Sequence, residues 1–262
     1  IGPAMMGGRI ADIAVSPTNK STWYVAVGSG GLWKTTNRGT TWEPIFDSQK
    51  SYSIGTVTID PNNPEVIWVG TGENVSGRHV AWGDGVYKSV NGGKTWTQMG
   101  LEKSEHIGKI LVHPRNSEVV FVAAEGPLWS SGGERGLYKT SDGGKTWQLV
   151  LEIDKNTGVT DMEFDPSNPD VIYAAAYQRR RQTWSLLAGG PKSGIYKSTD
   201  NGDSWNQVKT GLPNGDIGKI GLAVTPANPE IVYATIEAND KEKGFYRSLD
   251  KGESWEKQNS YI

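Results

Sequence analysis

Cysteine is absent from all 262 residues of this sequence, and its absence excludes several kinds of chemistry. Without thiols there can be no disulfide, no thiolate metal site and no cysteine nucleophile. Histidine is also scarce, since only His79, His106 and His113 occur, and none of these forms a paired-histidine metal motif. We therefore expect no metal site and no cofactor.

Long apolar runs and an excess of charge of one sign are missing too. The 27 Lys and Arg residues nearly balance the 29 Asp and Glu residues, which gives a net charge of −2. This balance lacks the basic field that would attract nucleic acid or an anionic membrane. No apolar run approaches the roughly 18 residues of a transmembrane helix. We expect neither a nucleic-acid partner nor a transmembrane segment.

One short motif, in contrast, occurs five times. It reads Ser or Thr, any residue, Asp or Asn, any residue, Gly, any residue, Ser or Thr, and Trp. Its acidic or amide positions are Asn37, Asn91, Asp142, Asp200 and Asp250. Its closing tryptophans are Trp42, Trp96, Trp147, Trp205 and Trp255. A period of roughly fifty residues indicates that one supersecondary unit is used repeatedly.

Each repeat contains short runs rich in Val, Ile, Tyr and Trp, bounded by Pro, Gly, Asn and Asp, as is typical of strands and turns. No stretch keeps the 3.6-residue apolar period of a core helix. Four strands per repeat predict an all-β fold, a β-propeller with five four-stranded blades in one domain, residues 1–262. The expected blades span residues 9–46, 51–99, 104–151, 156–209 and 215–258.

The five motifs are predicted to be structural. Asn or Asp can bond the backbone two residues on, and the glycine suits a position with positive φ. The five tryptophans are expected to be buried between sheets. We also expect an incomplete or openly ended ring that belongs to a larger propeller, in which Ile1–Met6 does not add an outer strand to the fifth blade; a closed five-bladed ring is the alternative at this size.

The motif resembles the Asp-box, or bacterial neuraminidase (BNR) repeat. Longer strings such as Gly30-Gly31-Leu32-Trp33-Lys34 and Trp82-Gly83-Asp84-Gly85 make the whole chain similar to the bacterial sortilin-like propellers, a group often labelled glycosyl hydrolase BNR repeat proteins. Animal sortilins carry disulfides, so the lack of cysteine fits the bacterial branch. The resemblance implies peptide or protein ligands and an extracellular, periplasmic or cell-surface location.

The strand order predicts two faces of different character. The Pro-Asn turns and the Asp-boxes lie on one face, while the loops between strands two and three and the connectors between blades lie on the other. That second face varies in length and sequence, and variable loops on a rigid scaffold commonly bind ligands. Its candidate ligand-binding residues are Arg78, Trp82, Trp129, Arg135, Arg180 and Trp184.

Each of these candidates has a simpler alternative. The three tryptophans can instead pack their own loops, and the run Arg179–Arg181 can be solvated or paired with local acids rather than clamp an anion. The innermost strands add a ring of Asp12, Thr56, Lys109, Asp161 and Lys219. This ring could bind a ligand or simply neutralise itself.

Two main functions remain open. The first is a secreted or cell-envelope scaffold that binds peptide, protein or glycan ligands, either alone or with further blades of a longer chain. The alternative is a glycoside hydrolase, which requires two carboxylates about 5 to 10 Å apart. Candidate carboxylates are Glu73, Asp84, Glu125 and Asp161, but none lies in a diagnostic motif, so no catalytic residue is identified. A sialidase is disfavoured, because Arg9 alone has a matching position.

Overall fold

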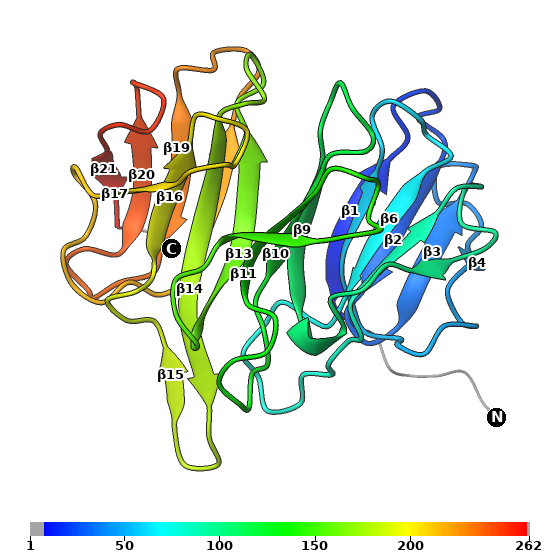
Figure 1. Cartoon of the computed structure of the whole chain (residues 1–262), viewed down its shortest axis with the longest axis horizontal. Coiled ribbons are helices and arrows are strands. Elements are labelled where there is room, and N and C mark those ends of the chain that lie inside the picture. Colours follow the sequence, from blue (N-terminus) through cyan, green and yellow to red (C-terminus); the bar gives the residue numbers. More distant parts are fainter. Residues whose placement is uncertain (1–7, 261–262) are drawn as a thin grey trace. The chain divides into compact units, whose positions relative to one another are not determined.

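The computed structural model describes residues 8–260, which form five antiparallel sheets and one short 3-10 turn (Figure 1). Each sheet has four strands that pair in chain order, and the fourth carries one additional strand, β15. The predicted all-β fold of four-stranded propeller blades is therefore confirmed. The predicted absence of a strand at Ile1–Met6 lies outside the described residues.

The strand bounds follow the repeats. The first sheet contains β1 (Ile10–Val15), β2 (Trp23–Val27), β3 (Gly31–Thr35) and β4 (Glu43–Pro44). The second contains β5 (Ile54–Ile59), β6 (Ile67–Thr71), β7 (Val86–Ser89) and β8 (Thr97–Gln98). The third contains β9 (Ile107–Val112), β10 (Val120–Ala124), β11 (Gly136–Thr140) and β12 (Gln148–Leu151), after the 3-10 turn η1 (Glu102–Ser104).

The fourth sheet has the longest strands, and the fifth resembles the first three in extent. The fourth contains β13 (Thr157–Phe164), β14 (Ile172–Arg181), β16 (Gly194–Ser198) and β17 (Asn206–Val208), with β15 (Leu186–Ala188) paired to β14. The fifth contains β18 (Ile220–Val224), β19 (Val232–Ile236), β20 (Gly244–Ser248) and β21 (Glu256–Asn259). Contacts between residues divide the chain into two compact units. Unit 1 comprises the residues up to Val122 together with Thr140–Trp147. Unit 2 comprises Ala123–Lys139 together with the residues from Gln148 onward.

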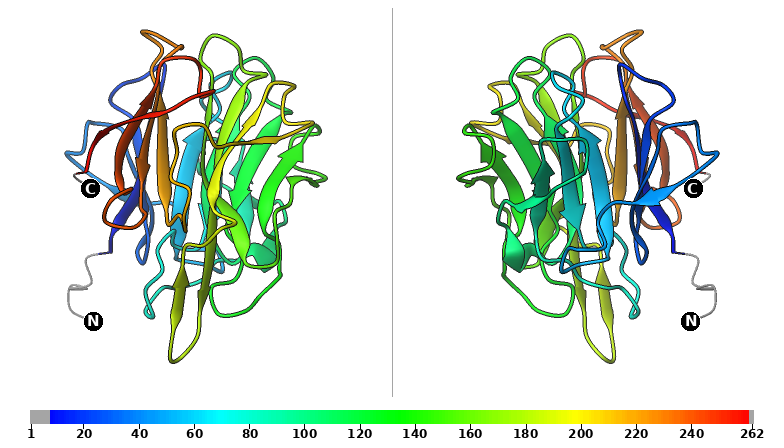
Figure 2. Two further views of the ribbon diagram at one scale, coloured as in Figure 1. Left: turned by 90° about the vertical axis from the view of Figure 1, so that its left-hand side faces the viewer. Right: turned by 90° about the vertical axis from the view of Figure 1, so that its right-hand side faces the viewer.

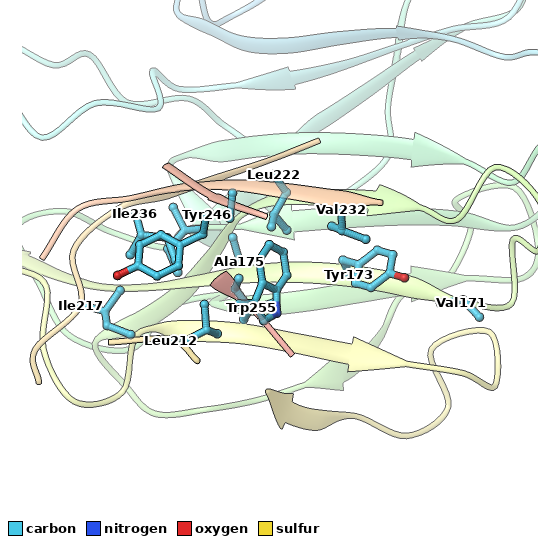
Figure 3. Close-up of a cluster of buried hydrophobic side chains, with 13 residues drawn as sticks. Val171, Tyr173, Ala175, Leu212, Ile217, Leu222, Val232, Ile236, Tyr246 and Trp255 are labelled. Atoms are coloured by element: carbon cyan, nitrogen blue, oxygen red, sulfur yellow. The ribbon is translucent and has the colours of Figure 1, made fainter. Parts of the chain in front are cut away.

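Apolar residues of neighbouring sheets form the core within each unit. In unit 2, Tyr173 and Ala175 of β14 pack with Leu222 of β18 and Val232 of β19, together with Trp255 (Figure 3). Because alternate strand residues point to the same face, every second apolar residue reaches this core. Burial of each large side chain stabilises the fold by about 1.5 to 3 kcal/mol.

Two aspartates of the predicted inner ring join one sheet to the next. Each follows a register shift in the first strand of its sheet, Asp12 in β1 and Asp161 in β13. Asp12 Oδ2 accepts from Thr56 Oγ1 at 2.8 Å and Val57 N at 3.1 Å, and Asp161 Oδ2 accepts from Leu222 N at 2.8 Å. A β-bulge can re-aim a side chain in this way. These carboxylates therefore hold neighbouring sheets together.

A basic residue of the third strand reaches the Asp-box of the next sheet. Lys34 Nζ donates to Gly92 O at 2.8 Å, Lys88 Nζ to Gly143 O at 3.1 Å, and Lys139 Nζ to Asn201 O at 2.7 Å. These three acceptors occupy the same position of successive boxes. The repeated lysine thus fixes the spacing of adjacent sheets.

We expect Lys88→Met to lower the free energy of unfolding by about 1 to 2 kcal/mol, since it removes this hydrogen bond and a cation–π contact. Lys88 Nζ lies 4.7 Å from the Trp68 ring centroid. Urea unfolding of both variants measures the effect against Lys94→Met, a change at an exposed lysine of the same unit. Equal losses in the two variants would contradict the role given to Lys88.

All five Asp-boxes share one set of hydrogen bonds. In the third, Thr140 Oγ1 donates to Asp142 Oδ1 at 2.7 Å, and the Gly144 and Thr146 amides donate to Thr140 Oγ1 and Asp142 Oδ1 at 3.0 and 2.9 Å. Asn37 and Asn91 accept from the corresponding amides at 2.9 Å in each case. The side chain at this position therefore closes the turn whether it is Asp or Asn.

The prediction that all five box tryptophans are buried is wrong. Trp255 is buried and Trp96, Trp147 and Trp205 are half-buried, but 40% of Trp42 is exposed. Trp96 Nε1 and Trp147 Nε1 donate to main-chain carbonyls of the preceding sheet. Trp42 packs instead on Trp23 of its own sheet, with ring centroids 6.5 Å apart. The motif fixes the turn, while the neighbouring sheet decides the burial.

These boxes predict a sensitivity to acid. Hydrogen bonds from Ser204 and Ser254 lower the pKa of Asp200 and Asp250 to about 2, and those from Thr146 lower the pKa of Asp142 as well. Carboxyls with a depressed folded pKa stabilise the protein above their unfolded pKa of 3.8 and lose that contribution as pH falls through the folded value. Stability should therefore decline between about pH 4 and pH 2.

Changing Asp142, Asp200 and Asp250 together to Asn should flatten this decline, because the amide keeps the acceptor and cannot be protonated there. Asn91 already shows the fit, since its Nδ2 donates to Thr95 Oγ1 at 2.8 Å. Thermal unfolding at pH 2, 3, 4 and 7 measures the difference. Parallel curves for the wild type and the triple variant would contradict this interpretation.

Candidate functional site

A cleft in unit 1 brings together residues from two variable loops. It has a volume of about 620 Å³ and is lined by Lys50, Ser51 and Tyr52 from the connector before β5 and by Arg78 to Asp84 from the loop between β6 and β7. We call it the Trp82 cleft. Its two aromatic side chains are largely exposed, Tyr52 by 62% and Trp82 by 68%. A cleft with aromatic walls and a few polar groups is the usual form of a small-ligand site.

The backbone around Trp82 is held from both sides. Ala81 O accepts from Ser53 Oγ at 2.9 Å, and Gly83 N donates to Glu105 O at 2.7 Å. Gly83 has no room for a side chain, because an added Cβ would overlap the Thr71 carbonyl carbon and the Gly72 nitrogen. The exposed indole therefore projects from a fixed main chain, and little ordering entropy is lost when a ligand contacts it.

Among the described residues, Asp84 is the one acidic residue that lines the Trp82 cleft. Its Oδ2 accepts from Tyr87 Oη at 2.6 Å, and its backbone N donates to Thr71 Oγ1 at 2.8 Å. Burial and this bond raise the pKa of the Tyr87 phenol well above its usual range. The carboxylate is thus tied to the scaffold that supports the loop.

Glu73 supports the opposite end of the same loop. Its carboxylate is buried, forms an ion pair with Arg9 and accepts from Ser29 Oγ at 2.5 Å. The main-chain oxygen of Glu73 lies 2.9 Å from His106 Nδ1. These contacts tie the start of the loop to Arg9 just before β1, to the turn between β2 and β3 and to the segment before β9, so Glu73 serves here as a scaffold residue.

Two predicted site residues lie in the β10–β11 loop of unit 2. Trp129 is 41% exposed. Arg135 is buried, and its guanidinium donates to the carbonyl oxygens of Gly132, Glu125 and Ser130 at 2.9, 2.7 and 2.8 Å, and also to Pro127 O. Because these bonds hold the loop that carries Trp129, we leave Arg135 out of the proposed binding site.

The other two predicted residues lie in a hairpin of unit 2. Strand β14 continues past its partners and turns back through Gln182–Ser185 into β15, so that the hairpin projects beyond the rest of its sheet (Figures 1 and 2). Trp184 lies in the turn and is 80% exposed. Arg180 pairs with Leu187 across the hairpin. Neither residue lines the Trp82 cleft.

The residue before Arg180 belongs to a buried ion pair. Arg179 Nη1 lies 2.9 Å from Glu125 Oε2, and both side chains are only 1% exposed. Lys219 adjoins this pair, and burial lowers the pKa of its ammonium group while Glu125 and Asp161 oppose the shift. Of the predicted Arg179–Arg181 run, the first residue is therefore paired with an acid inside the fold.

Two residues of the cleft, Lys50 and Tyr52, were not among the predicted ligand-binding residues. Both lie in the connector between the first and second sheets. The strand order had already assigned the connectors to the same face as the variable loops, so an aromatic and a basic residue in this connector were a detectable signal. Among residues 8–260, no group of three or more acidic or histidine side chains is placed to hold a metal ion.

Comparisons with known proteins agree with the Asp-box fold. Residues 84–190 match the family model described as Sortilin, neurotensin receptor 3. A probable oligoxyloglucan-reducing end-specific xyloglucanase of Neosartorya fischeri is 26% identical over 213 residues, which cover 77% of this chain and 24% of that protein. Xyloglucanase Xgh74A of Acetivibrio thermocellus is 24% identical, and the matched residues cover 26% of that protein. The chain is thus an Asp-box-like propeller that is similar to glycosyl hydrolase-related propellers.

Solved structures show the same fold. The GH74 enzyme of Niastella koreensis superposes on this propeller with a TM-score of 0.65 at 24% identity, over 93% of this chain and 37% of that one. YCF48 bound to D1 peptide gives a TM-score of 0.57 at 16% identity, over 96% of this chain and 67% of that one. The propeller spans about a quarter of the length of its curated relatives. In residues 8–260 no helix is long and apolar enough to cross a membrane.

Proposed function

We propose that this propeller is the glycan-binding part of a glycoside hydrolase of the xyloglucanase type and that it binds an oligosaccharide in the Trp82 cleft. The observation that carries the proposal is the Trp82 indole, which is 68% exposed. The residues on either side of it, Ala81 and Gly83, are fixed by main-chain hydrogen bonds. Aromatic rings supply large, rigid contact area at low entropic cost, which suits the apolar face of a sugar ring.

The sequence relatives support a glycan over the peptide ligands that the sortilin resemblance implies. Several are xyloglucanases that match three quarters or more of this chain. The names of these relatives give xyloglucan or its oligosaccharides as the material on which they act. With this function we propose the extracellular, periplasmic or cell-surface location that the sequence predicts.

Hydrolysis requires a pair of carboxylates, one of which must hold a proton. The Trp82 cleft has one acidic lining residue, Asp84, whose carboxylate already accepts from Tyr87. Glu125 and Asp161 belong to unit 2 and contact Arg179 and Leu222. We therefore assign binding to this chain and propose that the catalytic carboxylate pair lies in other parts of a longer protein.

Calorimetric titration with xyloglucan heptasaccharide, followed by chromatography of the incubated sugar, tests the assignment. We expect saturable binding and unchanged oligosaccharide. Product release that is lost in Asp84→Asn would move catalysis into this chain. The absence of binding to any oligosaccharide of a broad panel would overturn the proposed function.

A further inference from the structure

We infer that Asn214 is a site of spontaneous covalent modification, at which the side-chain amide is hydrolysed to a carboxylate through a cyclic imide. The inference goes beyond the proposed function, because Asn214 lies in unit 2, in the connector between β17 and β18, and does not line the Trp82 cleft. It comes from a comparison of the three Asn-Gly pairs of the sequence, which are Asn91-Gly92, Asn201-Gly202 and Asn214-Gly215.

An Asn-Gly pair carries its own nucleophile. Once the glycine nitrogen has lost its proton to hydroxide, it attacks the side-chain carbonyl carbon of the asparagine and closes a five-membered imide ring. The side-chain nitrogen takes a proton from water and leaves as ammonia. Water then opens the imide at either carbonyl, which gives aspartate or isoaspartate, so the net reaction consumes one water and releases one ammonia. Glycine favours the attack because it has no Cβ to crowd the nitrogen and its backbone rotates freely.

The first pair belongs to the second Asp-box, where hydrogen bonds hold both reacting groups. Gly92 N donates to Glu65 O at 2.8 Å, so the nucleophile is engaged. Asn91 Oδ1 accepts from Thr95 N at 2.9 Å, and Asn91 Nδ2 donates to Thr95 Oγ1 at 2.8 Å. The side-chain carbon cannot reach the glycine nitrogen unless these bonds break.

The second pair belongs to the fourth Asp-box and is held through its main chain. Gly202 N donates to Ser198 Oγ at 2.9 Å. Asn201 has a positive φ of 57°, its nitrogen donates to Asp170 O at 2.8 Å, and its main-chain oxygen accepts from Lys139 Nζ at 2.7 Å. Closure of the imide ring requires the main chain to rotate at Asn201, which would break these contacts. Both box pairs should therefore keep their amides while the protein is folded.

The third pair is exposed and is not held in this way. Within residues 8–260, neither the Asn214 side chain nor the Gly215 nitrogen forms a hydrogen bond to the chain, and only Asn214 N donates, to Glu242 Oε1 at 3.1 Å. An added Cβ at Gly215 would meet Glu242 Oε2 at 3.5 Å and Asn239 Nδ2 at 3.7 Å, so the space around it is open. Water and the side-chain carbon thus have access to the glycine nitrogen.

The products alter the connector that follows the fourth sheet. Either product places a carboxylate beside Glu242, whose Oε1 accepts from Asn214 N. Isoaspartate also adds one atom to the main chain three residues before Ile217, which exchanges two main-chain hydrogen bonds with Gly190. The modification therefore acts on the contact between this connector and the segment that precedes β16.

The test incubates the folded protein at mildly alkaline pH in water enriched in oxygen-18, followed by digestion at low pH and peptide mass spectrometry. We expect the peptide that contains Asn214 to become a mixture of aspartate and isoaspartate that carries oxygen from the solvent. The peptides that contain Asn91 and Asn201 should keep their amides. The same incubation in concentrated urea should modify all three pairs at similar rates, because unfolding removes the contacts that protect the boxes.

Variants locate the reaction. Gly215→Val should slow the modification of Asn214, because a branched side chain crowds the attacking nitrogen. The matched control Lys209→Val changes another exposed residue of the same connector and should leave the rate unchanged.

Three results would overturn the inference. One is modification of Asn91 or Asn201 in the folded protein as fast as that of Asn214. Another is an Asn214 that keeps its amide in the folded protein although all three pairs react in urea. The third is aspartate as the sole product at Asn214, since direct hydrolysis without an imide gives no isoaspartate.

Discussion

Replacing Arg179 with methionine should lower the free energy of unfolding by about 3 to 5 kcal/mol, because the change leaves a buried charge without its counterion. The carboxylate of Glu125 is 1% exposed and lies 2.9 Å from the guanidinium. Water cannot reach it to replace the lost contact. Guanidinium chloride unfolding at pH 7 measures the loss.

A double variant separates the charge from the packing. Glu125→Leu combined with Arg179→Met removes both ions and should recover part of the stability, since buried ion pairs can often be replaced by apolar side chains, while the adjoining Lys219 keeps Asp161 and Glu237 as acidic neighbours. If Arg179→Met alone stays within 1 kcal/mol of the wild type, the pair is not the buried contact described here. If the double variant is as unstable as the single one, the loss of stability comes from altered side-chain packing and not from the unpaired charge.

Gly83→Ala should remove oligosaccharide binding and also destabilise unit 1. An added Cβ at this position would overlap the main chain at Thr71 and Gly72, so the segment that carries Trp82 must move. Overpacking of this kind typically costs about 1 to 3 kcal/mol. Binding should suffer more than stability, because the indole is positioned by the same main chain.

Calorimetry and thermal unfolding of the same preparation measure both effects. Gly132→Ala is a suitable control, since an added Cβ there has no neighbour within 4 Å, although its positive φ of 78° still carries a backbone cost. We expect this control to bind the oligosaccharide like the wild type. Full binding in Gly83→Ala would show that the fixed backbone is unimportant.

Most of the fold could be predicted because it repeats. Each Asp-box closes its turn with contacts between residues at most four positions apart, such as Thr140 with Gly144, so the local sequence contains all the information. The strand boundaries follow from the same repeat. Burial of Trp42 could not be predicted in this way, because it depends on whether another sheet covers the box.

The candidate site was only partly accessible to sequence reasoning. Trp82 and Arg78 were identified because they lie in a long variable loop, but Tyr52 lies in a separate connector and meets them only in the folded chain. Arg135 and Arg179 share the residue type of a binding arginine, yet both are buried. Their partners are main-chain oxygens and Glu125, which residue type and local spacing do not reveal.

The central claim is that the Trp82 cleft binds oligosaccharide, and a pair of tryptophan variants tests it most directly. Trp82 and Trp184 are exposed by 68% and 80%, so each change to Ala removes a surface indole, but only Trp82 lines the cleft. In calorimetric titrations with the same oligosaccharide, we predict that Trp82→Ala weakens binding at least tenfold, or about 1.4 kcal/mol, and that Trp184→Ala binds like the wild type. Loss of binding in Trp184→Ala with normal binding in Trp82→Ala would contradict the account.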